Sequence, residues 1–299
     1  MARNIRIAAV QSAPHPIGMP LDAFENELIE VISHNPDVQF VVFPELHLFS
    51  ADDAAEGDRT SRLNAAAISL DSDFVRSLGA IARRAGIWLL PGSICERGTG
   101  AELYNTALVF SPDGELVTHY RKVFPWRPSE PYDMGDRFVT FDIPGAGRFG
   151  ISICYDSWFP EVTRQLAWMG AEIIINIVKT TTDDRAQELV LARANSIVNQ
   201  TFTVSVNCAG PIGKGRSILV DPEGAALAET DDAPAVLVRT FDLDAVANVR
   251  ASGTAGLNRM WSQFTTTDPT LELPIYSGRI SPERWNPKSA SPTEEESRS

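Results

Sequence analysis

Apolar and polar positions along the 299-residue chain alternate between two patterns. Short runs rich in β-branched residues predict buried strands, and longer stretches with apolar residues three or four positions apart predict helices. The predicted strands cover residues 5–10, 38–43, 87–93, 149–153, 172–178 and 201–206. The predicted helices cover residues 21–33, 73–86, 160–170 and 185–199, and two hairpins cover residues 103–123 and 217–227.

This alternation determines the predicted fold class. Strands that are apolar at successive positions are buried on both faces, and alternating strands and helices form a mixed or parallel sheet that helices cover. The chain is therefore predicted to be an α/β protein. Regularity fades from about Asp244, and the polar stretch 286–299 is predicted to be a mobile tail.

Composition narrows the possible partners. The chain is 43% hydrophobic and carries a formal net charge of −13, with an isoelectric point near 4.8. So acidic a chain is a poor binder of nucleic acid or anionic membranes, since both require basic patches. No apolar run reaches the roughly 18 residues that span a bilayer. The N-terminus lacks the pattern of a signal peptide, so we expect a cytoplasmic protein with no nucleic-acid or membrane partner.

The cysteines and histidines favour neither disulfides nor metal binding. Cys95, Cys154 and Cys208 are odd in number and far apart in sequence, which fits a reducing compartment. No pair of cysteines or histidines has the spacing of a zinc site. We therefore expect no metal.

One cysteine occupies a chemically distinctive position. In the stretch "FGISICYDSWFPE", Cys154 ends a predicted strand and precedes a predicted helix. The N–H groups at a helix start favour negative charge, so they are expected to lower the pKa of a thiol there and to stabilise an oxyanion. The alternative is a core cysteine at the end of a strand. Cys95 and Cys208 lack a following helix, and we interpret both as core residues.

A nucleophilic cysteine requires a base, and an acid is the better candidate. Among the histidines only His47 lies near a strand end, whereas Glu45 directly follows "VQFVVFP". In the segment "YRKVFPWRPSEP", Lys122 and Glu130 are eight residues apart among prolines and a tryptophan. Such a partly apolar loop would desolvate both ions and favour their pairing, whereas a lone lysine at a strand end is normally solvated.

Three of these segments resemble a known family. "FPE" with Glu45, "YRK" with Lys122 and "ICYDSWFPE" with Cys154 resemble, in order and spacing, the signature segments of the nitrilase superfamily of carbon–nitrogen hydrolases. The resemblance covers about residues 5–243. It implies a four-layer α-β-β-α sandwich, with a hydrolase domain over residues 1–270 and a C-terminal extension over 271–299. It also implies a homodimer or a larger homo-oligomer.

The resemblance implies a role for each of the matched residues. Cys154 would attack the substrate carbon and form a thioester, and Glu45 would act as the general base and acid. Lys122 and the backbone N–H of Tyr155 would hold the oxyanion. Glu130 matches a second glutamate that positions substrate and catalytic groups in the family's amidases. No cofactor is implied.

The same segments favour one branch of the family. "RKVFPWRPSE" is similar to the aliphatic amidases and formamidases, which carry a tryptophan four residues and a glutamate eight residues after the lysine. True nitrilases usually place Trp-Glu directly after the cysteine, where this chain has Tyr155 and Asp156. One departure from the aliphatic amidases is Thr180, which stands where they carry an aromatic residue.

We therefore expect hydrolysis of a small linear amide, with loss of ammonia. The predicted substrate-binding residues are Trp126, Tyr155, Trp158 and Thr180, although each could instead serve packing or an interface. The alternatives are hydrolysis of an N-carbamoyl-amino acid or an omega-amide, which would require a cation in the pocket. A nitrilase, an acyl transferase or a catalytically silent binding module are further alternatives. No arginine within a catalytic motif obviously pairs with a substrate carboxylate, which favours a neutral amide.

Overall fold

The computed structural model describes residues 3–55, 57–274 and 278–280. Two β-sheets form its centre. The first sheet has seven strands in the order β13 (Ala235–Asp242), β1 (Asn4–Gln11), β2 (Phe40–Val42), β3 (Trp88–Leu90), β5 (Leu103–Phe110) and β4 (Ser93–Arg97), with β6 (Leu116–Arg121) also paired to β5. The second sheet has the order β12 (Ala226–Glu229), β11 (Ile218–Val220), β10 (Phe202–Asn207), β9 (Ile173–Val178), β8 (Gly147–Ile153) and β7 (Thr140–Ile143).

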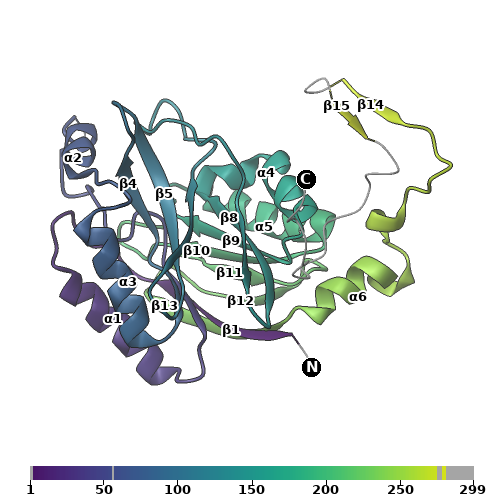
Figure 1. Cartoon of the computed structure of the whole chain (residues 1–299), viewed down its shortest axis with the longest axis horizontal. Coiled ribbons are helices and arrows are strands. Elements are labelled where there is room, and N and C mark those ends of the chain that lie inside the picture. Colours follow the sequence, from purple (N-terminus) through teal and green to yellow (C-terminus); the bar gives the residue numbers. More distant parts are fainter. Residues whose placement is uncertain (1–2, 56, 275–277, 281–299) are drawn as a thin grey trace, which may run out of the picture.

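Helices cover the outer faces of the two sheets (Figure 1). The α-helices are α1 (Leu21–His34), α2 (Arg59–Ala66), α3 (Asp73–Ala85), α4 (Pro160–Trp168), α5 (Arg185–Asn199) and α6 (Asp244–Ser252). Three 3₁₀ helices are η1 (Cys154–Trp158), η2 (Thr254–Gly256) and η3 (Met260–Ser262). A separate two-stranded sheet, β14 (Leu271–Leu273) and β15 (Gly278–Ile280), lies away from the two large sheets in Figure 1.

Side-chain alternation along the strands produces four layers. In β1, Ile5, Ile7 and Ala9 belong to the core between the sheets, where they meet strands β8 to β10. Ala8 and Val10 point the other way, into the core beneath α1 and α3. On the far side, α4 and α5 cover the second sheet through separate apolar clusters. The predicted four-layer α-β-β-α sandwich is therefore confirmed.

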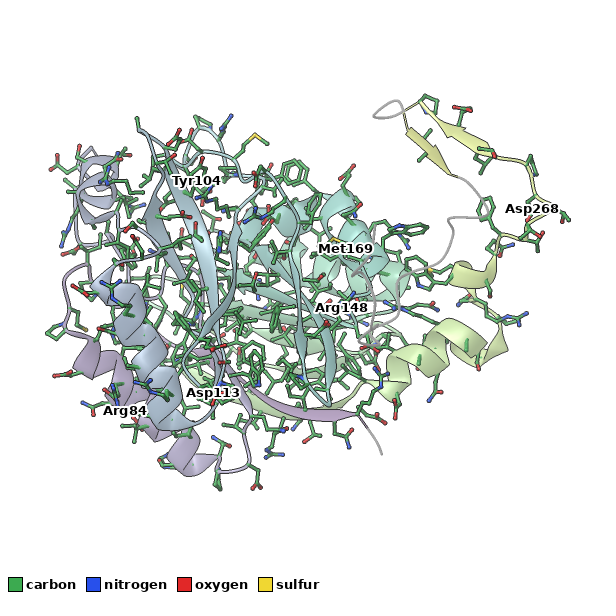
Figure 2. All side chains as sticks on the ribbon, viewed as in Figure 1. Arg84, Tyr104, Asp113, Arg148, Met169 and Asp268 are labelled. Carbon is green, nitrogen blue, oxygen red and sulfur yellow. The ribbon has the colours of Figure 1, made fainter. Side chains whose placement is uncertain are left out.

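Side chains fill the space between the layers and also join elements at the surface (Figure 2). Arg148 on β8 donates to the carbonyl oxygen of Met169 just after α4, at 3.0 Å, and the two residues lie close together in Figure 2. Asp268, by contrast, lies on the segment that leads out to β14. This hydrogen bond thus ties the second sheet to the end of α4. The described segment around Asp268 lies outside the core.

Most predicted elements occur near their predicted positions, and the differences have physical reasons. The helix α3 ends at Gly86 with a φ of 65°, a left-handed conformation that glycine adopts without strain. The prediction that regularity fades from Asp244 was wrong, because α6 starts there and buries Val246. The predicted tail, residues 286–299, lies outside the described residues. Of the predicted extension 271–299, only residues 271–274 and 278–280 are described.

Two further sequence predictions can be compared with the structure. All three cysteines are free, and Cys95 and Cys208 are buried, as predicted for core residues. Among the described helices, none is long and apolar enough to cross a membrane.

Candidate active site

Three charged side chains predicted as catalytic meet between the sheets. Glu45 follows β2, Lys122 follows β6, and Glu130 lies in the loop after Lys122. The Lys122 ammonium donates to Glu45 Oε1 at 3.2 Å and to the two carboxylate oxygens of Glu130 at 2.8 and 2.9 Å. Lys122 and Glu45 are almost completely buried. One cation thus pairs with two carboxylates, and its contact with Glu130 is the pairing that the sequence predicted.

Burial dominates the electrostatics of this cluster. It raises the pKa of Glu45 above its ordinary value, and the charge of Glu130 adds to the effect while Lys122 opposes it. Burial alone would lower the pKa of Lys122, but the charges of Glu45 and Glu130 raise it well above the ordinary value. Asn105 on β5 donates to Glu45 Oε1 at 2.7 Å. Lys122 therefore remains an ammonium, and Glu45 is a buried carboxyl held in a fixed orientation.

Cys154 lies at the junction of β8 and η1, as predicted, but its thiol is not activated as predicted. Its φ is 48°, a left-handed conformation that is unusual for a residue with a side chain. Burial raises the pKa of the thiol well above its ordinary value, and the charge of Glu45 raises it further. Lys122 acts in the opposite direction. The expected lowering by a helix start is wrong, because burial and a nearby carboxylate outweigh it.

A buried aspartate connects the loop of Lys122 to the turn of Cys154. Asp156 accepts hydrogen bonds from the hydroxyl of Tyr120 at 2.7 Å and from the backbone N–H groups of Ile153 and Phe124, each at 2.9 Å. Burial raises the pKa of Asp156 to about 6. This carboxyl fixes the end of β6 against the end of β8, so it fixes Lys122 relative to Cys154.

A small pocket opens onto the two acids. It has a volume of about 160 Å³, below the usual range of about 300–1,000 Å³ for drug-sized ligands. Its lining consists of Glu45, Leu46, Phe49, Ala51, Asp52, Arg59, Thr60, Leu63, Trp126, Ser129, Glu130, Pro131, Tyr132, Lys179 and Thr181. Trp126, one of the predicted substrate-binding residues, is at its rim with 44% of its surface exposed. The backbone N–H of Trp126 also donates to Glu130 Oε2 at 2.8 Å.

The other predicted substrate-binding residues lie beside Cys154, and in the described chain they do not line this pocket. Tyr155 and Trp158 are half-buried, with ring centroids 6.1 Å apart. Thr180 is buried, with its hydroxyl oxygen 3.9 Å from the sulfur of Cys154. The same hydroxyl donates to Glu188 on α5 at 2.8 Å, and Arg185 pairs with Glu188 at 2.9 Å.

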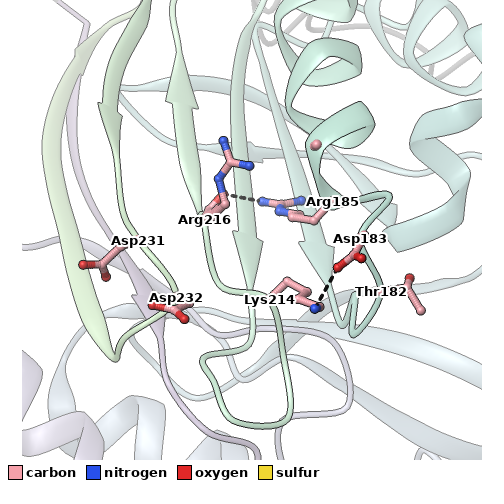
Figure 3. Close-up of a pocket in the computed structure, with 8 residues that line it drawn as sticks. Thr182, Asp183, Arg185, Lys214, Arg216, Asp231 and Asp232 are labelled. Atoms are coloured by element: carbon pink, nitrogen blue, oxygen red, sulfur yellow. Dashed lines mark hydrogen bonds and ion pairs between the residues drawn. The ribbon is translucent and has the colours of Figure 1, made fainter.

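Figure 3 shows a second, larger pocket of about 430 Å³. It is lined by Thr182, Asp183, Arg185, Ala186, Lys214, Arg216, Asp231 and Asp232. Lys214 pairs with Asp183 at 2.8 Å, and Arg185 donates to the carbonyl oxygen of Arg216 at 2.9 Å. None of the predicted catalytic residues lines it.

One group among the described residues has the composition of a metal site. The Nε2 atoms of His15 and His47 each lie 3.0 Å from the same carboxylate oxygen of Glu27. Burial would raise the pKa of Glu27, but the hydrogen bonds to the two histidines hold it well below its usual range. These hydrogen bonds account for the cluster without an ion. The cluster ties α1 to the loop that follows Glu45.

Sequence reasoning missed several residues of this region. Asn105 is a polar residue inside an apolar strand pattern, and Asp156 is an acid two positions after the candidate nucleophile. Lys179 directly follows the apolar strand 173–178, just as Glu45 follows 38–43, so the argument applied to Glu45 could have found it. The partners of these residues could not be found in this way, since they lie far away in sequence.

Comparison with known proteins identifies the family to which these features correspond. The model of the carbon-nitrogen hydrolase family matches residues 6–251. The crystal structure of Saccharomyces cerevisiae Nit3, a member of branch 10 of the nitrilase superfamily, superposes with a TM-score of 0.75 at 26% identity, covering 86% of this chain and 97% of Nit3. An amidase from Nesterenkonia sp. has a TM-score of 0.68 at 24% identity, covering 84% and 94% of the two chains, and so supports the fold alone.

A closer sequence relative matches over a shorter stretch. The formamidase of Bacillus thuringiensis is 42% identical over 120 residues, which are 40% of this chain and 36% of the formamidase. Formamidases of Bacillus cereus and Bacillus anthracis match to the same extent. The matched stretch thus spans little more than a third of the length of these relatives.

Proposed function

Because the chain belongs to the carbon–nitrogen hydrolase family, within the nitrilase superfamily, we propose that it hydrolyses the C–N bond of a small linear amide. The observation that carries this proposal is the buried cluster of Glu45, Lys122 and Glu130, whose charges shift the pKa of the Cys154 thiol. The similarity to formamidases supports an amide as the substrate class. The products are a carboxylic acid and ammonia.

In the acylation half of the reaction, Glu45 takes the proton from Cys154 as the sulfur attacks the carbonyl carbon. A base is needed at that moment, because the raised pKa of the thiol leaves it protonated in the resting enzyme. The ammonium of Lys122 and the backbone N–H of Tyr155 stabilise the tetrahedral oxyanion. Glu45 then protonates the leaving nitrogen, the C–N bond of the tetrahedral intermediate breaks, and ammonia departs to leave the thioester.

In the second half, water replaces ammonia. Glu45, again a carboxylate, takes a proton from a water molecule as the oxygen of that water attacks the thioester carbon. Glu45 then gives the proton to the sulfur of Cys154, which leaves as the C–S bond breaks. Glu130 is a positioning residue in this scheme, since it holds Lys122 through two contacts at 2.8 and 2.9 Å. Amide and water are thereby converted to acid and ammonia, with no cofactor.

We also propose that the protein is a homo-oligomer that pairs through a helical face. The outward side of α5 exposes three apolar residues, Val190, Ile197 and Val198. Exposed apolar groups clustered on one face are a feature of protein–protein contacts. Sedimentation equilibrium should therefore give a mass of at least twice the 32.7 kDa of one chain. A monomer at micromolar concentration would contradict this proposal.

The test of the proposed function is a substrate panel. Formamide, acetamide, propionamide, glutaramate, an N-carbamoyl amino acid and a short nitrile are each incubated with the protein, and ammonia and carboxylic acid are measured. We expect equal amounts of ammonia and acid from amides and neither product from the nitrile. Ammonia from the nitrile alone, or from no substrate, would contradict the proposal. Added hydroxylamine should divert part of the thioester to hydroxamate, with less free acid.

A further inference from the structure

A buried ion pair lines the same pocket as Glu45 and Glu130. Lys179 directly follows β9, and its ammonium lies 2.5 Å from Oδ2 of Asp52, in the loop between β2 and α2. Only 12% of the Lys179 side chain and 14% of the Asp52 side chain are exposed. Such a pair is costly to desolvate and contributes little to stability, so its position in a pocket wall calls for another explanation.

This wall of the pocket is close to the reacting groups. The same pocket is lined by Glu45 and Lys179, and the residue after Lys179 is Thr180, whose hydroxyl is 3.9 Å from Cys154. The charges of Lys179, Glu45 and Asp52 also all shift the pKa of one buried thiol, that of Cys208, so the three groups lie near the same point. The ion pair therefore shares one small space with the catalytic acids.

The wall carries a net positive charge. Asp52 is already surrounded by donors, since Oδ2 also accepts from the hydroxyl of Ser50 and Oδ1 lies 3.4 Å from the guanidinium of Arg59. Lys179 and Arg59 supply two positive charges against the one negative charge of Asp52. An ammonium has three donors, and Asp52 is the ion-pair partner of Lys179 among the described residues. The wall can therefore donate to an anion, whereas its one carboxylate is occupied.

The catalytic end of the pocket has the opposite sign. Glu45 and Glu130 carry two negative charges, and Lys122 balances one of them. A bound molecule thus meets acidic side chains, Glu45 and Glu130, on one part of the lining and the positively charged group of Lys179 and Arg59 on another. A neutral alkyl chain gains nothing from this polarity, and it offers no acceptor to the N–H groups of Lys179 that Asp52 does not use.

We infer that Lys179, supported by Arg59 and oriented by Asp52, binds an anionic group at the distal end of the substrate, so that the substrate is a linear amide with a terminal carboxylate. This inference rests on the proposed function and names its substrate class. It differs from the expectation of a neutral amide, which was based on the absence, within the catalytic motifs, of an arginine that obviously pairs with a substrate carboxylate. The cation comes instead from the residue after β9.

The test compares shape-matched substrates that differ in charge. Succinamate is paired with 4-methylpentanamide, and glutaramate with 5-methylhexanamide, because an isopropyl group has nearly the shape of a carboxylate. The cationic probe is 4-aminobutyramide. We expect kcat/KM to favour the anionic member of at least one pair by about 10- to 100-fold, the range of a charge-assisted hydrogen bond. Lys179→Met should remove that preference, because it should raise KM for the anionic substrate by a larger factor than KM for its neutral partner.

Two further variants control for the unpaired charge of Asp52 and for the loss of a lysine as such. Lys179→Met leaves Asp52 buried without its partner, so the double variant Lys179→Met/Asp52→Asn, which removes both charges, is measured beside it. The matched control is Lys214→Met, which removes a lysine that lies in the second pocket. Both Lys179 variants should lose the anionic preference, and Lys214→Met should retain it.

The outcomes separate this inference from the proposed function. Equal kcat/KM for the matched pairs, a preference for 4-aminobutyramide, or an equal loss on all substrates in Lys179→Met would overturn the role of Lys179 and leave amide hydrolysis intact. Absence of all turnover would contradict the proposed function. Calorimetry of Cys154→Ala with succinamate and glutaramate then decides the inference alone. Binding that weakens at least 10-fold on adding Lys179→Met supports it, and no binding overturns it.

Discussion

The two pockets contain the same kinds of ion pair, but they differ in burial. In the pocket beside Glu45, the side chains of Lys179 and Asp52 are 12% and 14% exposed. In the pocket of Figure 3, the side chains of Lys214 and Asp183 are 45% and 98% exposed. The exposed pair belongs to the larger pocket, about 430 Å³ against about 160 Å³. The larger pocket is therefore the one whose ion pair is more exposed to water.

The difference follows from the surroundings of each charge. Water screens an exposed pair, so neither ion is held in place strongly. A buried charge interacts strongly with its neighbours and shifts their protonation, as Glu45 does to Cys154. Perturbed pKa values in a cleft are typical of functional sites. The comparison predicts that charge changes in the small pocket affect function and that those in the large pocket do not.

Among changes of charge, the largest effect is expected for Glu130→Gln. The amide keeps the shape of the side chain but removes one of the two negative charges that hold Lys122. We expect kcat/KM to fall by about 100-fold or more, the cost of disturbing an oxyanion-stabilising group. The circular dichroism spectrum and the thermal midpoint should stay close to those of the wild type. Wild-type rates in this variant would show that the contacts of Glu130 with Lys122 are not needed for the reaction.

A smaller effect, on stability, is expected from the titration of Asp156. Folding raises the pKa of this carboxyl from 3.8 to about 6, so the native state binds the proton more tightly than the unfolded chain does. Its contribution to the free energy of unfolding is complete below pH 3.8 and is lost as the pH rises to about 6. At about 1.4 kcal/mol per unit of pKa, the loss is about 3 kcal/mol.

This change is measured by urea unfolding of the wild type and of Asp156→Asn, which cannot titrate, at several pH values. The free energy of unfolding of the wild type, relative to that of the variant, should decrease between pH 4 and pH 7 and then level off. A difference that stays constant with pH would contradict the assignment of a raised pKa to Asp156. A difference that increases would mean that the hydrogen bonds from Tyr120, Ile153 and Phe124 outweigh burial.

The smallest effect is expected in the large pocket. Asp183→Asn and Lys214→Met each break the exposed ion pair of Figure 3. We expect kcat/KM for any amide substrate to stay within about twofold of the wild type, because exposed pairs contribute little. A much larger loss in either variant would show that burial is the wrong criterion for separating the two pockets.

The sequence predicted those parts of the fold that depend on long regular patterns. The apolar run 172–178 became β9, and the pattern 185–199 became α5 without change. Helix α2 was missed because it buries a single residue, Leu63, and so has no apolar repeat. Strand β13 was missed because most of its residues are exposed or half-buried, and its pairing with β1 joins opposite ends of the domain.

The candidate site could be predicted only as far as residue types and strand ends allow. Glu45, Lys122 and Cys154 each follow a strand, so their positions were accessible from the sequence. The direction of the pKa shift of Cys154 was not, because it depends on burial and on a carboxylate more than 100 residues away in the chain. The pairing of Lys179 with Asp52 could not be predicted either, because these residues are also more than 100 positions apart in the chain.

The measurement that tests the account most directly is ammonia release by Cys154→Ala beside the wild type, with the amide that the wild type hydrolyses best. Removal of one sulfur changes little in the packing, so the variant should give the circular dichroism spectrum of the wild type. We expect no ammonia above the uncatalysed rate, because no thioester can form. Ammonia release by a folded Cys154→Ala at a rate near that of the wild type would contradict Cys154 as the nucleophile.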